Sequence, residues 1–313
     1  MFTTSLACQD SKENCALEIR DNGIAYAHIC YPERDNSRPI LKHCGFFNGE
    51  DSLEQLAESL NLIANKYNAK NVKCNWVLAQ KYYRLLLVNT PNVPTSEHKD
   101  ALRWQLKDMI DHPANDMTID TFAPSSFSQI DHPKLYTVVA QSSVLQKLVT
   151  LIKQATFTLQ AIDIQEFAIR NLLAALPSTS QSTGFLHINS VECLLTIVKN
   201  GELHFVRRIP ITTDIMQSID ERTFDRIGDE ISKSLDYYTA ELKQEMPKEF
   251  LLSPTIEKNS PFVSNIKNRV PLQFSNLLLN KAVRIENSAD FSEDLLKKCY
   301  IAIGGALRQS EEQ

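Results

Sequence analysis

The sequence predicts an α/β protein made of two related halves, with a small α+β module inserted in the first half. A β-hairpin signature occurs twice, at residues 15–32 and again at 193–210. Strand and helix patterns alternate through the rest of both halves, which is typical of sheets covered by helices. Between the two hairpins, residues 81–163 follow a β-α-β-β-α-β order of their own. Self-similarity over so long a period usually reports a duplicated unit.

The hairpin signature is specific at its turn and at its ends. In CLLTIVKNGELHFVRRIP, apolar residues alternate on both sides of Asn200-Gly201, and Asn-Gly suits the two positive-φ positions of a type I′ turn. CALEIRDNGIAYAHICYP carries Asn22-Gly23 at the same place. The first cysteine and the last proline of the two stretches also match, all at one offset (193 − 15 = 178). This alignment favours a common architectural origin over two unrelated hairpins.

Residues 1–80 are expected to form the first half, in the order β-β-β-α-β. After the hairpin comes a third strand, and then a helix that Asp51 or Ser52 can cap. The leucines of this helix keep helical spacing, so one of its faces is apolar. The expected segments are the hairpin at 15–31, the third strand at 40–47, the helix at 51–69 and the last strand at 72–78.

The inserted module is expected at residues 81–163. Its first helix, SEHKDALRWQLKDMI, has Ser96 as its candidate N-cap and stops at Asp111-His112-Pro113. A return helix and a Ser/Thr-rich linker are expected at 164–183, and the second half at 184–313. The second half repeats the strand and hairpin, followed by a long helix from about residue 213 to 244, the strands EFLLSP and VPLQFS, and a last helix, EDLLKKCYIAIGGALRQ.

The composition excludes several classes of protein. The 313 residues carry a net charge of −5 and no basic run with interleaved aromatics, which argues against nucleic acid as a partner. No apolar run approaches the roughly 20 residues that cross a bilayer, so no direct membrane span is expected. The N-terminus lacks the basic and apolar segments of a secretory signal. A cytoplasmic protein is therefore expected, and seven cysteines without a Cys-x-x-Cys motif fit reduced thiols.

No catalytic or metal-binding motif stands out. The histidines show no His-x-x-x-His spacing and no pairing with cysteines at zinc spacing, so no metal site is expected. Gly-x-Ser-x-Gly, Walker-type and Gly-x-Gly-x-x-Gly motifs are absent from the sequence. With 8 glycines in 313 residues, the chain has little material for loops that cradle phosphate groups. Composition and motifs thus favour a protein that is not an enzyme.

Two further features have a packing explanation and a functional one. Gly304-Gly305 is the only glycine pair, and close helix packing between the two halves explains it better than contact with a ligand does. In the inserted helix, Leu102 and Leu106 keep helical spacing, which puts Trp104 on the opposite side. The simpler explanation is that the helix packs between two layers, so that Trp104 is buried on its second face. The functional explanation is that Trp104 forms part of a docking surface, because aromatics outside the apolar stripe are typical anchors for partners.

The order of these units resembles the actin-like fold of the pilus-assembly protein PilM and the cell-division protein FtsA. The resemblance is closer still to the MshI proteins of MSHA-type (mannose-sensitive haemagglutinin) pilus biogenesis. The stretches that carry the resemblance are YYRLLLVNTPNVPTSEHKDALRWQLKDMIDHPANDMTIDTF, LQAIDIQEFAIRNLL, TIVKNGELHFVRRIP, ERTFDRIGDEISKSLDYY and AIGGALR. The resemblance implies a duplicated, ribonuclease-H-like fold whose inserted module is of the SHS2 type.

In this family, two phosphate hairpins and a Gly-rich adenosine loop grip a nucleotide between the halves. The segment that matches the first phosphate hairpin contains Glu18 and lacks the Asp-x-Gly-Ser/Thr turn. His187-Ile188-Asn189-Ser190 replaces the Asp-Ile-Gly turn of the second, and Ser253-Pro254-Thr255 stands where the adenosine loop should begin. These departures remove backbone donors for phosphate and the anchor for magnesium. The resemblance therefore implies a degenerate, non-hydrolysing member without ATP or magnesium as cofactor.

PilM-like proteins lie in the cytoplasm, peripheral to the inner membrane, and hold the N-terminal tail of a bitopic inner-membrane protein. That protein is PilN, or MshJ in the MSHA system. The resemblance implies such a tail as partner, captured in a groove or by strand addition, and the assembly ATPase as a second partner. The corresponding surface would involve Tyr82, Tyr83, Leu85 and Leu87 at the start of the insert and Trp104 on its helix.

Two other functions are compatible with the same fold class. A nucleotide-dependent actin-fold ATPase would drive pilus assembly through a switch, but the glycine count and the three altered loops weigh against it. A sugar-kinase-like enzyme would need an Asp base beside a phosphate turn, and the sequence offers none. A scaffold that binds the tail of a membrane protein is therefore the expected function.

Overall fold

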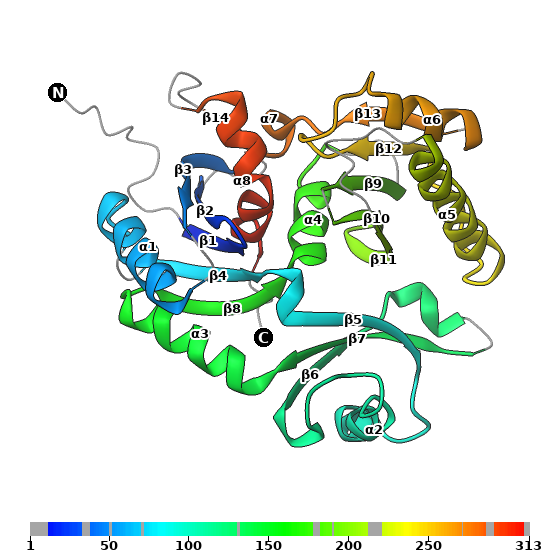
Figure 1. The fold of residues 1–313 in the computed structure, drawn as a ribbon, viewed down its shortest axis with the longest axis horizontal. Coiled ribbons are helices and arrows are strands. Elements are labelled where there is room, and N and C mark those ends of the chain that lie inside the picture. Colours follow the sequence, from blue (N-terminus) through cyan, green and yellow to red (C-terminus); the bar gives the residue numbers. More distant parts are fainter. Residues whose placement is uncertain are drawn as a thin grey trace. The chain divides into compact units, whose positions relative to one another are not determined.

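A computed structural model of the chain describes residues 12–32, 38–49, 52–69, 72–129, 132–177, 182–189, 191–211, 221–270, 272–285 and 291–309. The chain divides into two compact units (Figure 1). The first consists of Met1–Ile169 together with Val283–Gln313, and the second of Arg170–Ala282.

The first unit is built on a six-stranded sheet in the order β14-β3-β2-β1-β4-β8. β1 and β2 form an antiparallel hairpin that β3 extends, whereas β4 and β8 continue the sheet in parallel on the other side. The predicted β-β-β-α-β order is therefore present. The strands are β1 (Lys12–Arg20), β2 (Gly23–Tyr31), β3 (Ile40–Asn48), β4 (Lys73–Leu78), β8 (Thr158–Ile164) and β14 (Arg284–Ile285).

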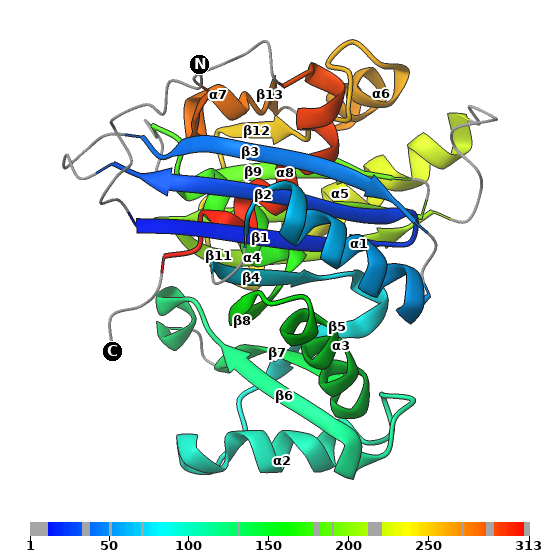
Figure 2. The same cartoon turned by 90° about the vertical axis from the view of Figure 1, so that its left-hand side faces the viewer.

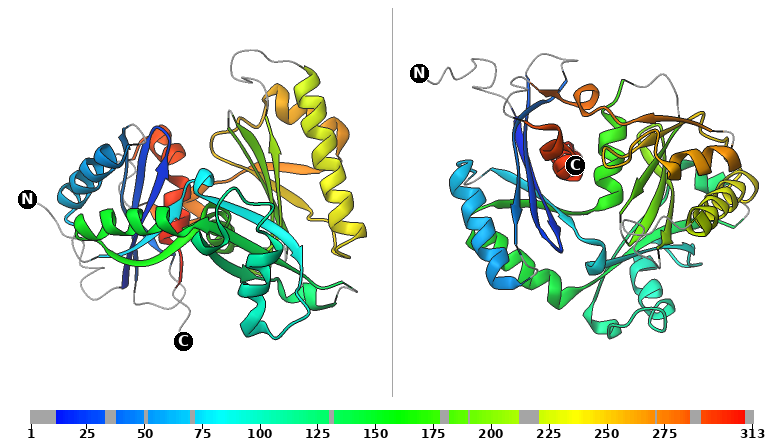
Figure 3. Two further views of the ribbon diagram at one scale, coloured as in Figure 1. Left: turned by 60° about the horizontal axis from the view of Figure 1, so that its bottom comes forward. Right: turned by 45° about the horizontal axis from the view of Figure 1, so that its top comes forward.

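Helices cover both faces of this sheet (Figures 2 and 3). α1 (Leu53–Lys66) and α3 (Ser142–Gln154) contact each other on one face, and α8 (Glu293–Ala306) lies on the other. Because side chains alternate along a strand, Cys15 and Leu17 of β1 enter the core beneath α1, whereas Ala16, between them, lies beneath α8. Ser52 caps α1 by accepting the N–H of Gln55, as the sequence predicts.

The last helix belongs to the first unit, so the prediction that residues 184–313 form one half is wrong for the C-terminal segment. β14 pairs with β3, and α8 packs against β1, β2, β3 and β4. The physical reason lies in the side chains of both partners. All residues of α8 from Cys299 to Ala306 are buried, and small residues such as Ala16 and Ala27 on β1 and β2 let the helix approach the sheet closely.

The inserted module of the first unit is a three-stranded antiparallel sheet in the order β5-β7-β6. α2 covers one face, where Leu102, Leu106 and Ile110 join strand residues in a separate core. α2 is shorter than predicted, because it ends at Gln105 and a turn continues the chain. The elements are β5 (Tyr83–Asn89), α2 (His98–Gln105), β6 (Met117–Phe122), β7 (Lys134–Gln141) and four 3₁₀ turns (Gln80–Tyr82, Thr95–Glu97, Ala114–Asp116, Ser125–Gln129).

The second unit is built on a five-stranded sheet in the order β11-β10-β9-β12-β13. Two helices, α5 and α6, pack against each other on one face of it (Figure 3), with the rings of Phe224 and Phe262 5.6 Å apart. The predicted start of α5, from residue 213, lies outside the described residues. The elements are α4 (Gln165–Ala174, which crosses the boundary between the units), β9 (Ser182–Ile188), β10 (Glu192–Lys199), β11 (Glu202–Pro210), α5 (Glu221–Ala240), β12 (Glu249–Leu252), α6 (Pro261–Arg269), β13 (Gln273–Asn276) and α7 (Leu279–Ala282).

Both predicted hairpins form, but only the second turns at its Asn-Gly pair. Asn200-Gly201 has φ values of +52° and +78°, the combination that a type I′ turn requires. In the first hairpin Arg20 pairs with Gly23, so the loop is Asp21-Asn22 and the predicted turn at Asn22-Gly23 is wrong. Gly23 instead begins β2 with φ +144°, and a Cβ there would lie 2.1 Å from the carbonyl oxygen of Phe47. This glycine is needed for close strand approach.

The cysteines are mostly, but not all, reduced. Five of those that the structure describes are buried free thiols. Cys30 on β2 is disulfide-bonded, so the expectation of reduced thiols throughout the chain is wrong at this position.

Candidate functional site

β5 is an edge strand with one open row of backbone hydrogen-bonding groups. In an antiparallel pair, residues that bond their partner alternate with residues whose N–H and C=O point away from it. The N–H of Thr90, just past β5, donates to the carbonyl of Pro133 at 2.9 Å. The register of β5 and β7 places Thr90 opposite Pro133, so these two residues are a hydrogen-bonded pair. Because bonded pairs recur at every second residue, the even-numbered residues of β5 are the ones that bond β7. The N–H and C=O groups of Leu85 and Leu87 therefore point outward along the edge that no other strand of this sheet occupies.

The side chains of Leu85 and Leu87 lie on the face of the insert sheet opposite α2. Their neighbour Leu86 packs into the α2 core, and successive strand residues point to opposite faces. On the face of Leu87, its register partner Tyr136 stacks on Phe122 with ring centroids 5.1 Å apart. Leu85 and Leu87 are themselves only half-buried. An apolar surface thus borders the open backbone edge.

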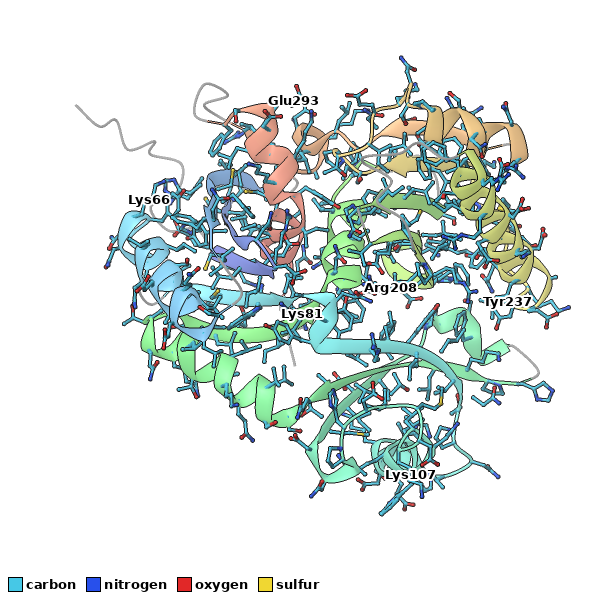
Figure 4. All side chains as sticks on the ribbon, viewed as in Figure 1. Lys66, Lys81, Lys107, Arg208, Tyr237 and Glu293 are labelled. Carbon is cyan, nitrogen blue, oxygen red and sulfur yellow. The ribbon has the colours of Figure 1, made fainter. Side chains whose placement is uncertain are left out.

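The two tyrosines at the start of β5 have structural partners. Tyr83 is 4% exposed, and its hydroxyl donates to Oε2 of Glu166 at 2.6 Å. This hydrogen bond fixes the base of β5 to the start of α4. Tyr82 is half-buried, with the ammonium of Lys81 5.1 Å from its ring centroid. Lys81, which is labelled in Figure 4, also pairs with Asp21 in the loop of the first hairpin at 2.8 Å.

Trp104 is a solvent-exposed side chain on the outer surface of α2. Its side chain is 67% exposed, whereas Leu102 of the same helix and Leu106, just after the helix, are fully buried. α2 covers the face of the insert sheet opposite Leu85 and Leu87. The structure therefore brings the β5 leucines together but separates Trp104 from them by the thickness of the sheet.

Glu18 on β1 is held by an ion pair within the first unit. Its carboxylate accepts a hydrogen bond from Nη2 of Arg20 at 2.7 Å, and the same nitrogen donates to the carbonyl of Lys298 on α8 at 2.6 Å. Burial raises the pKa of the Glu18 carboxyl, and the adjacent guanidinium opposes that shift. The charge of this buried carboxylate is thus compensated by Arg20, which also ties β1 to α8.

The Asn189 side chain satisfies backbone donors at the start of β10. Oδ1 of Asn189 accepts the backbone N–H groups of Val191 and Glu192, at 2.8 and 2.9 Å. The N–H of Asn189 in turn donates to the carbonyl of Glu192 at 3.0 Å. Such an Asx turn satisfies backbone donors that a phosphate hairpin would present to its ligand. His187 is buried at the end of β9, and Ser190 lies outside the described residues.

The loop after β12 begins with a buried serine whose groups are already bonded. The N–H of Ser253 donates to the carbonyl of Leu186 at 2.8 Å, and its carbonyl accepts the N–H of Ile256 at 2.9 Å. Its hydroxyl lies 2.8 Å from that of Thr255. These bonds hold the loop against β9 as a tight turn.

Gly304-Gly305 packs α8 against the sheet of its own unit. A Cβ on Gly305 would lie 2.6 Å from Cγ2 of Val77 and 3.0 Å from Cβ of Ala16. Nδ2 of Asn75 donates to the carbonyl of Gly305 at 3.1 Å. The pair therefore serves a helix–sheet contact inside the first unit.

Sequence reasoning missed the partners of two predicted residues. Arg20 could have been found, because residues two apart on a strand share a face and Arg20 follows Glu18 by two. Glu166 offers no such signal, since it lies 83 positions from Tyr83 along the chain. Only the folded topology brings these two side chains together.

Neither a metal cluster nor a membrane-spanning helix is found in the described parts of the chain. No three His, Cys, Asp or Glu side chains among these residues could hold a metal ion. Of the helices described, none combines the length and the apolar character that crossing a bilayer demands.

Comparison with solved structures gives a consistent fold. The sequence matches no protein-family model and no curated protein. A chain of the PilM-PilN type IV pilus biogenesis complex superposes with a TM-score of 0.70 at 16% identity, covering 94% of this chain and 98% of that chain. A Bacteroides thetaiotaomicron protein of actin-like ATPase fold and unknown function has a TM-score of 0.51 at 10% identity, covering 96% and 99% of the two chains.

The cytoplasmic domain of EpsL, an inner membrane component of the type II secretion system of Vibrio cholerae, has a TM-score of 0.48 at 13% identity, with 92% and 94% of the chains covered. That score is too low to support an argument about this chain. The two stronger superpositions extend over nearly the whole chain and agree with the observed sheets. This protein has an actin-like α/β fold.

Proposed function

We propose that this chain is a scaffold of type IV pilus assembly that holds the N-terminal tail of a bitopic inner-membrane protein along the open edge of β5. The observation that carries the proposal is the outward row of backbone groups at Leu85 and Leu87, bordered by an apolar face. The likeness in fold to a chain of the PilM-PilN complex supports it.

Strand addition matches the chemistry of this edge. An extended peptide would bond the free N–H and C=O groups of Leu85 and Leu87, and every second side chain of the peptide would lie on the Leu87–Tyr136 face. That face is apolar, so the tail should carry apolar residues at alternating positions. Arg84 and Asn89, exposed near the ends of β5, would meet polar groups there.

The finer identity follows from the same resemblance. The partner is PilN-like, and in an MSHA pilus it is the MshJ protein. The scaffold works in the cytoplasm, peripheral to the inner membrane, with the assembly ATPase as its second partner. Trp104, exposed on the far side of the insert sheet from Leu85 and Leu87, is free to serve that second contact.

A degenerate nucleotide site belongs to the proposal, because three of the positions that replace nucleotide-binding motifs have internal partners. Asn189 accepts the N–H groups of Val191 and Glu192. Ser253 donates its N–H to Leu186. Glu18 is paired with Arg20. These contacts do not fit the backbone cradle and free carboxylate that a nucleotide and its magnesium ion need. One of the similar structures is described as having an actin-like ATPase fold, so a nucleotide-driven switch is the rival function.

The tail-binding proposal is tested with a fluorescein-labelled peptide of the PilN N-terminal tail and, in parallel, of the MshJ tail. Leu87→Pro removes an outward N–H without removing a bond to β7, since proline is tolerated at edge positions of this kind. Thr121→Pro is the matched control, because Thr121 lies on β6 at the opposite edge and its N–H donates to Oδ1 of Asp120. We expect at least tenfold weaker binding for Leu87→Pro and unchanged binding for Thr121→Pro. Equal loss in both variants, or no binding to the wild type, would reject the proposal.

The nucleotide rival is tested by the melting temperature in ATP and magnesium. A ligand that binds only the folded state raises the melting temperature with its concentration. We expect no rise up to about 1 mM ATP, a concentration well above the dissociation constant of a working site. A magnesium-dependent rise would overturn the degenerate site and favour the ATPase.

A further inference from the structure

The outer side of β3 is covered by a neighbouring strand over only part of its length. β14 lies on that side and pairs with Ile40 and Leu41 alone, whereas β3 continues to Asn48. Among the strands that the structure describes, none pairs with the outer side of residues 44–48. We call this outer side the β3 edge.

Alternate residues of the β3 edge point their backbone groups outward. The N–H of Gly49, just past β3, donates to the carbonyl of Asn22 at 3.2 Å, so these residues are a hydrogen-bonded pair on the register of β2 and β3. Because bonded pairs recur at every second residue, the even-numbered residues point away from β2. The carbonyl of Cys44 agrees with this assignment, since it accepts a hydroxyl from the end of α1 at 3.1 Å. Phe46 and Asn48 thus present their N–H and C=O groups at the edge.

An ammonium group lies on each face of the sheet beside the β3 edge. On the face of α1, Nζ of Lys66 is 5.3 Å from the ring centroid of Phe47 and 5.2 Å from that of Tyr67; Lys66 is labelled in Figure 4. On the face of α8, Nζ of Lys298 is 5.5 Å from the ring centroid of Phe46. Both lysines are exposed, and neither pairs with a carboxylate in the parts of the chain that the structure describes. Two uncompensated positive charges therefore flank the edge.

β6, an edge strand of the insert sheet, provides an internal comparison. Nη2 of Arg103 donates to the outward carbonyl of Met117 at 3.2 Å, and the N–H of Thr121 donates to Oδ1 of Asp120 at 3.0 Å. The ammonium of Lys99 pairs with the same carboxylate at 2.9 Å. At β6, charged side chains compensate one another and occupy outward backbone groups. The β3 edge has neither protection at its last two outward residues.

The chemistry of the β3 edge fits an extended segment with two consecutive acidic residues. Such a segment would bond the outward groups of Phe46 and Asn48 as an added strand. Its successive side chains would point to opposite faces, so that one carboxylate reaches Lys298 and the next reaches Lys66. A second copy of this chain fits poorly, because a two-fold axis at the edge would bring like ammonium groups together.

We propose that the β3 edge binds an acidic, extended segment of a partner protein by strand addition, with Lys66 and Lys298 selecting its two carboxylates. This edge belongs to the six-stranded sheet, whereas β5 belongs to the insert sheet. The two edges also differ in chemistry, since β5 is bordered by an apolar face and the β3 edge by two cations. The inference therefore goes beyond the proposed function and does not depend on it.

The test measures fluorescence anisotropy of a fluorescein-labelled peptide, Thr-Val-Glu-Glu-Val-Thr, with the full chain at low salt, beside its Gln-Gln counterpart. We expect the Glu-Glu peptide to bind at least about fivefold more tightly, because it gains two exposed ion pairs. The double variant Lys66→Gln with Lys298→Gln should lose this preference. Lys267→Gln, which removes an exposed lysine from the second unit, should keep it. No binding, or equal binding of the two peptides to the wild type, would overturn the proposal.

A backbone variant separates this site from the β5 edge. Asn48→Pro removes an outward N–H and should weaken the Glu-Glu peptide by at least about threefold, while binding of the PilN tail peptide stays unchanged. Leu87→Pro should have the opposite pattern, so failure of either proposal is recognised by itself. If Asn48→Pro does not fold, the lysine variants decide. Loss of the Glu-Glu peptide in Leu87→Pro, or lysine-dependent binding to phosphatidylglycerol vesicles in place of the peptide, would overturn the inference.

Discussion

The hairpins β1–β2 and β10–β11 start from matching sequences and reach different geometries. β1–β2 keeps one register from Lys12 to Arg20 and turns at Asp21-Asn22. β10–β11 turns at Asn200-Gly201 and carries an irregularity after Ile197. The difference lies in their neighbours. β2 has β3 beside it, whereas β11 is the edge strand of its sheet. Asn-Gly therefore forms the turn in the hairpin whose second strand, β11, is at the edge of its sheet. It does not form the turn in the hairpin whose second strand, β2, pairs with a further strand.

Each hairpin also carries a buried Glu–Arg pair, formed in two ways. Glu18 and Arg20 lie on one strand, two residues apart, and reach the helix α8. Glu192 and Arg208 join the two strands of the second hairpin. The first pair thus links its hairpin to the helix α8, whereas the second links the two strands of its own hairpin, β10 and β11.

Removing the arginine of either pair should give the largest loss of stability. Arg20→Met and Arg208→Met each leave a buried carboxylate without its guanidinium, which costs about 3 kcal/mol. Urea unfolding would measure the loss. The only two tryptophans, Trp76 and Trp104, belong to the first unit, so tryptophan fluorescence reports the unfolding of that unit. The urea midpoint followed by this fluorescence should fall for Arg20→Met, in the first unit, and stay unchanged for Arg208→Met, in the second.

The double variant Glu18→Gln with Arg20→Met is the control for this effect. With no carboxylate left to bury, it should recover most of the loss. The single variant should also become more stable as the pH falls from 7 to 5. The pKa of Glu18 is raised by burial, and protonation removes the uncompensated charge. A flat pH profile would contradict this explanation.

The two turn glycines should differ in sensitivity. Gly23→Ala meets a backbone carbonyl at a φ of +144°, and we expect a loss of about 3 kcal/mol. Gly201→Ala meets no atom within 4 Å and keeps a left-handed turn, so about 1 kcal/mol is expected. Urea midpoints of the two variants, followed by circular dichroism, measure this difference. Equal losses would show that the neighbouring strand does not control the turn.

Acid should weaken the first hairpin through Glu13. Nε2 of His28 lies 3.1 Å from its carboxylate, which also bonds Lys42, and these contacts lower the pKa of Glu13 to about 2. The stabilisation is present above the unfolded-state pKa of about 4.5 and is lost as the pH falls toward 2. Glu13→Gln should remove about 1 kcal/mol at pH 7, after allowance for partial exposure, and flatten the stability profile between pH 5 and 2. Melting temperatures across that range are the measurement, with Glu54→Gln, at the start of α1, as an exposed control.

The smallest effect is expected at the entry to the second hairpin. Asn189→Ala frees the N–H groups of Val191 and Glu192, which should cost about 1 kcal/mol. Asn189→Asp keeps an acceptor at the same place and should restore the stability. Circular dichroism during urea unfolding would show both effects, and a loss in Asn189→Asp equal to that in Asn189→Ala would contradict the role of the Oδ1 acceptor.

Local patterns in the sequence predict most elements of the fold but not every pairing. The hairpins, the helices and the strands of the inserted module follow from alternation, caps and turn residues. The predicted extent of that module, residues 81–163, is wrong at its end, because β8 pairs with β4 in the six-stranded sheet and α3 contacts α1. The return of α8 to the first unit could not be predicted, since its run of small and apolar residues would suit either sheet. The disulfide at Cys30 likewise depends on which residues the fold brings together.

The candidate site shows the same division between local and long-range information. Leu85 and Leu87 are recognisable as alternate residues of an apolar strand. Among the strands that the structure describes, β5 pairs with β7 alone, which leaves the outward backbone groups of these leucines without a strand partner. No local pattern in the sequence reports this. Tyr83 appears equivalent in the sequence, yet its hydroxyl bonds a buried carboxylate across 83 positions.

The return of the chain to the first unit sets an order for biosynthesis. The ribosome makes β1 to β8 first, then the whole of the second unit, and only then β14 and α8. The contiguous second unit can close as soon as it emerges. The first sheet must wait, with its alanine-lined face open to solvent and to other nascent chains, until the helix that covers it has been synthesised. The part of the protein that is translated first is thus the last to be completed.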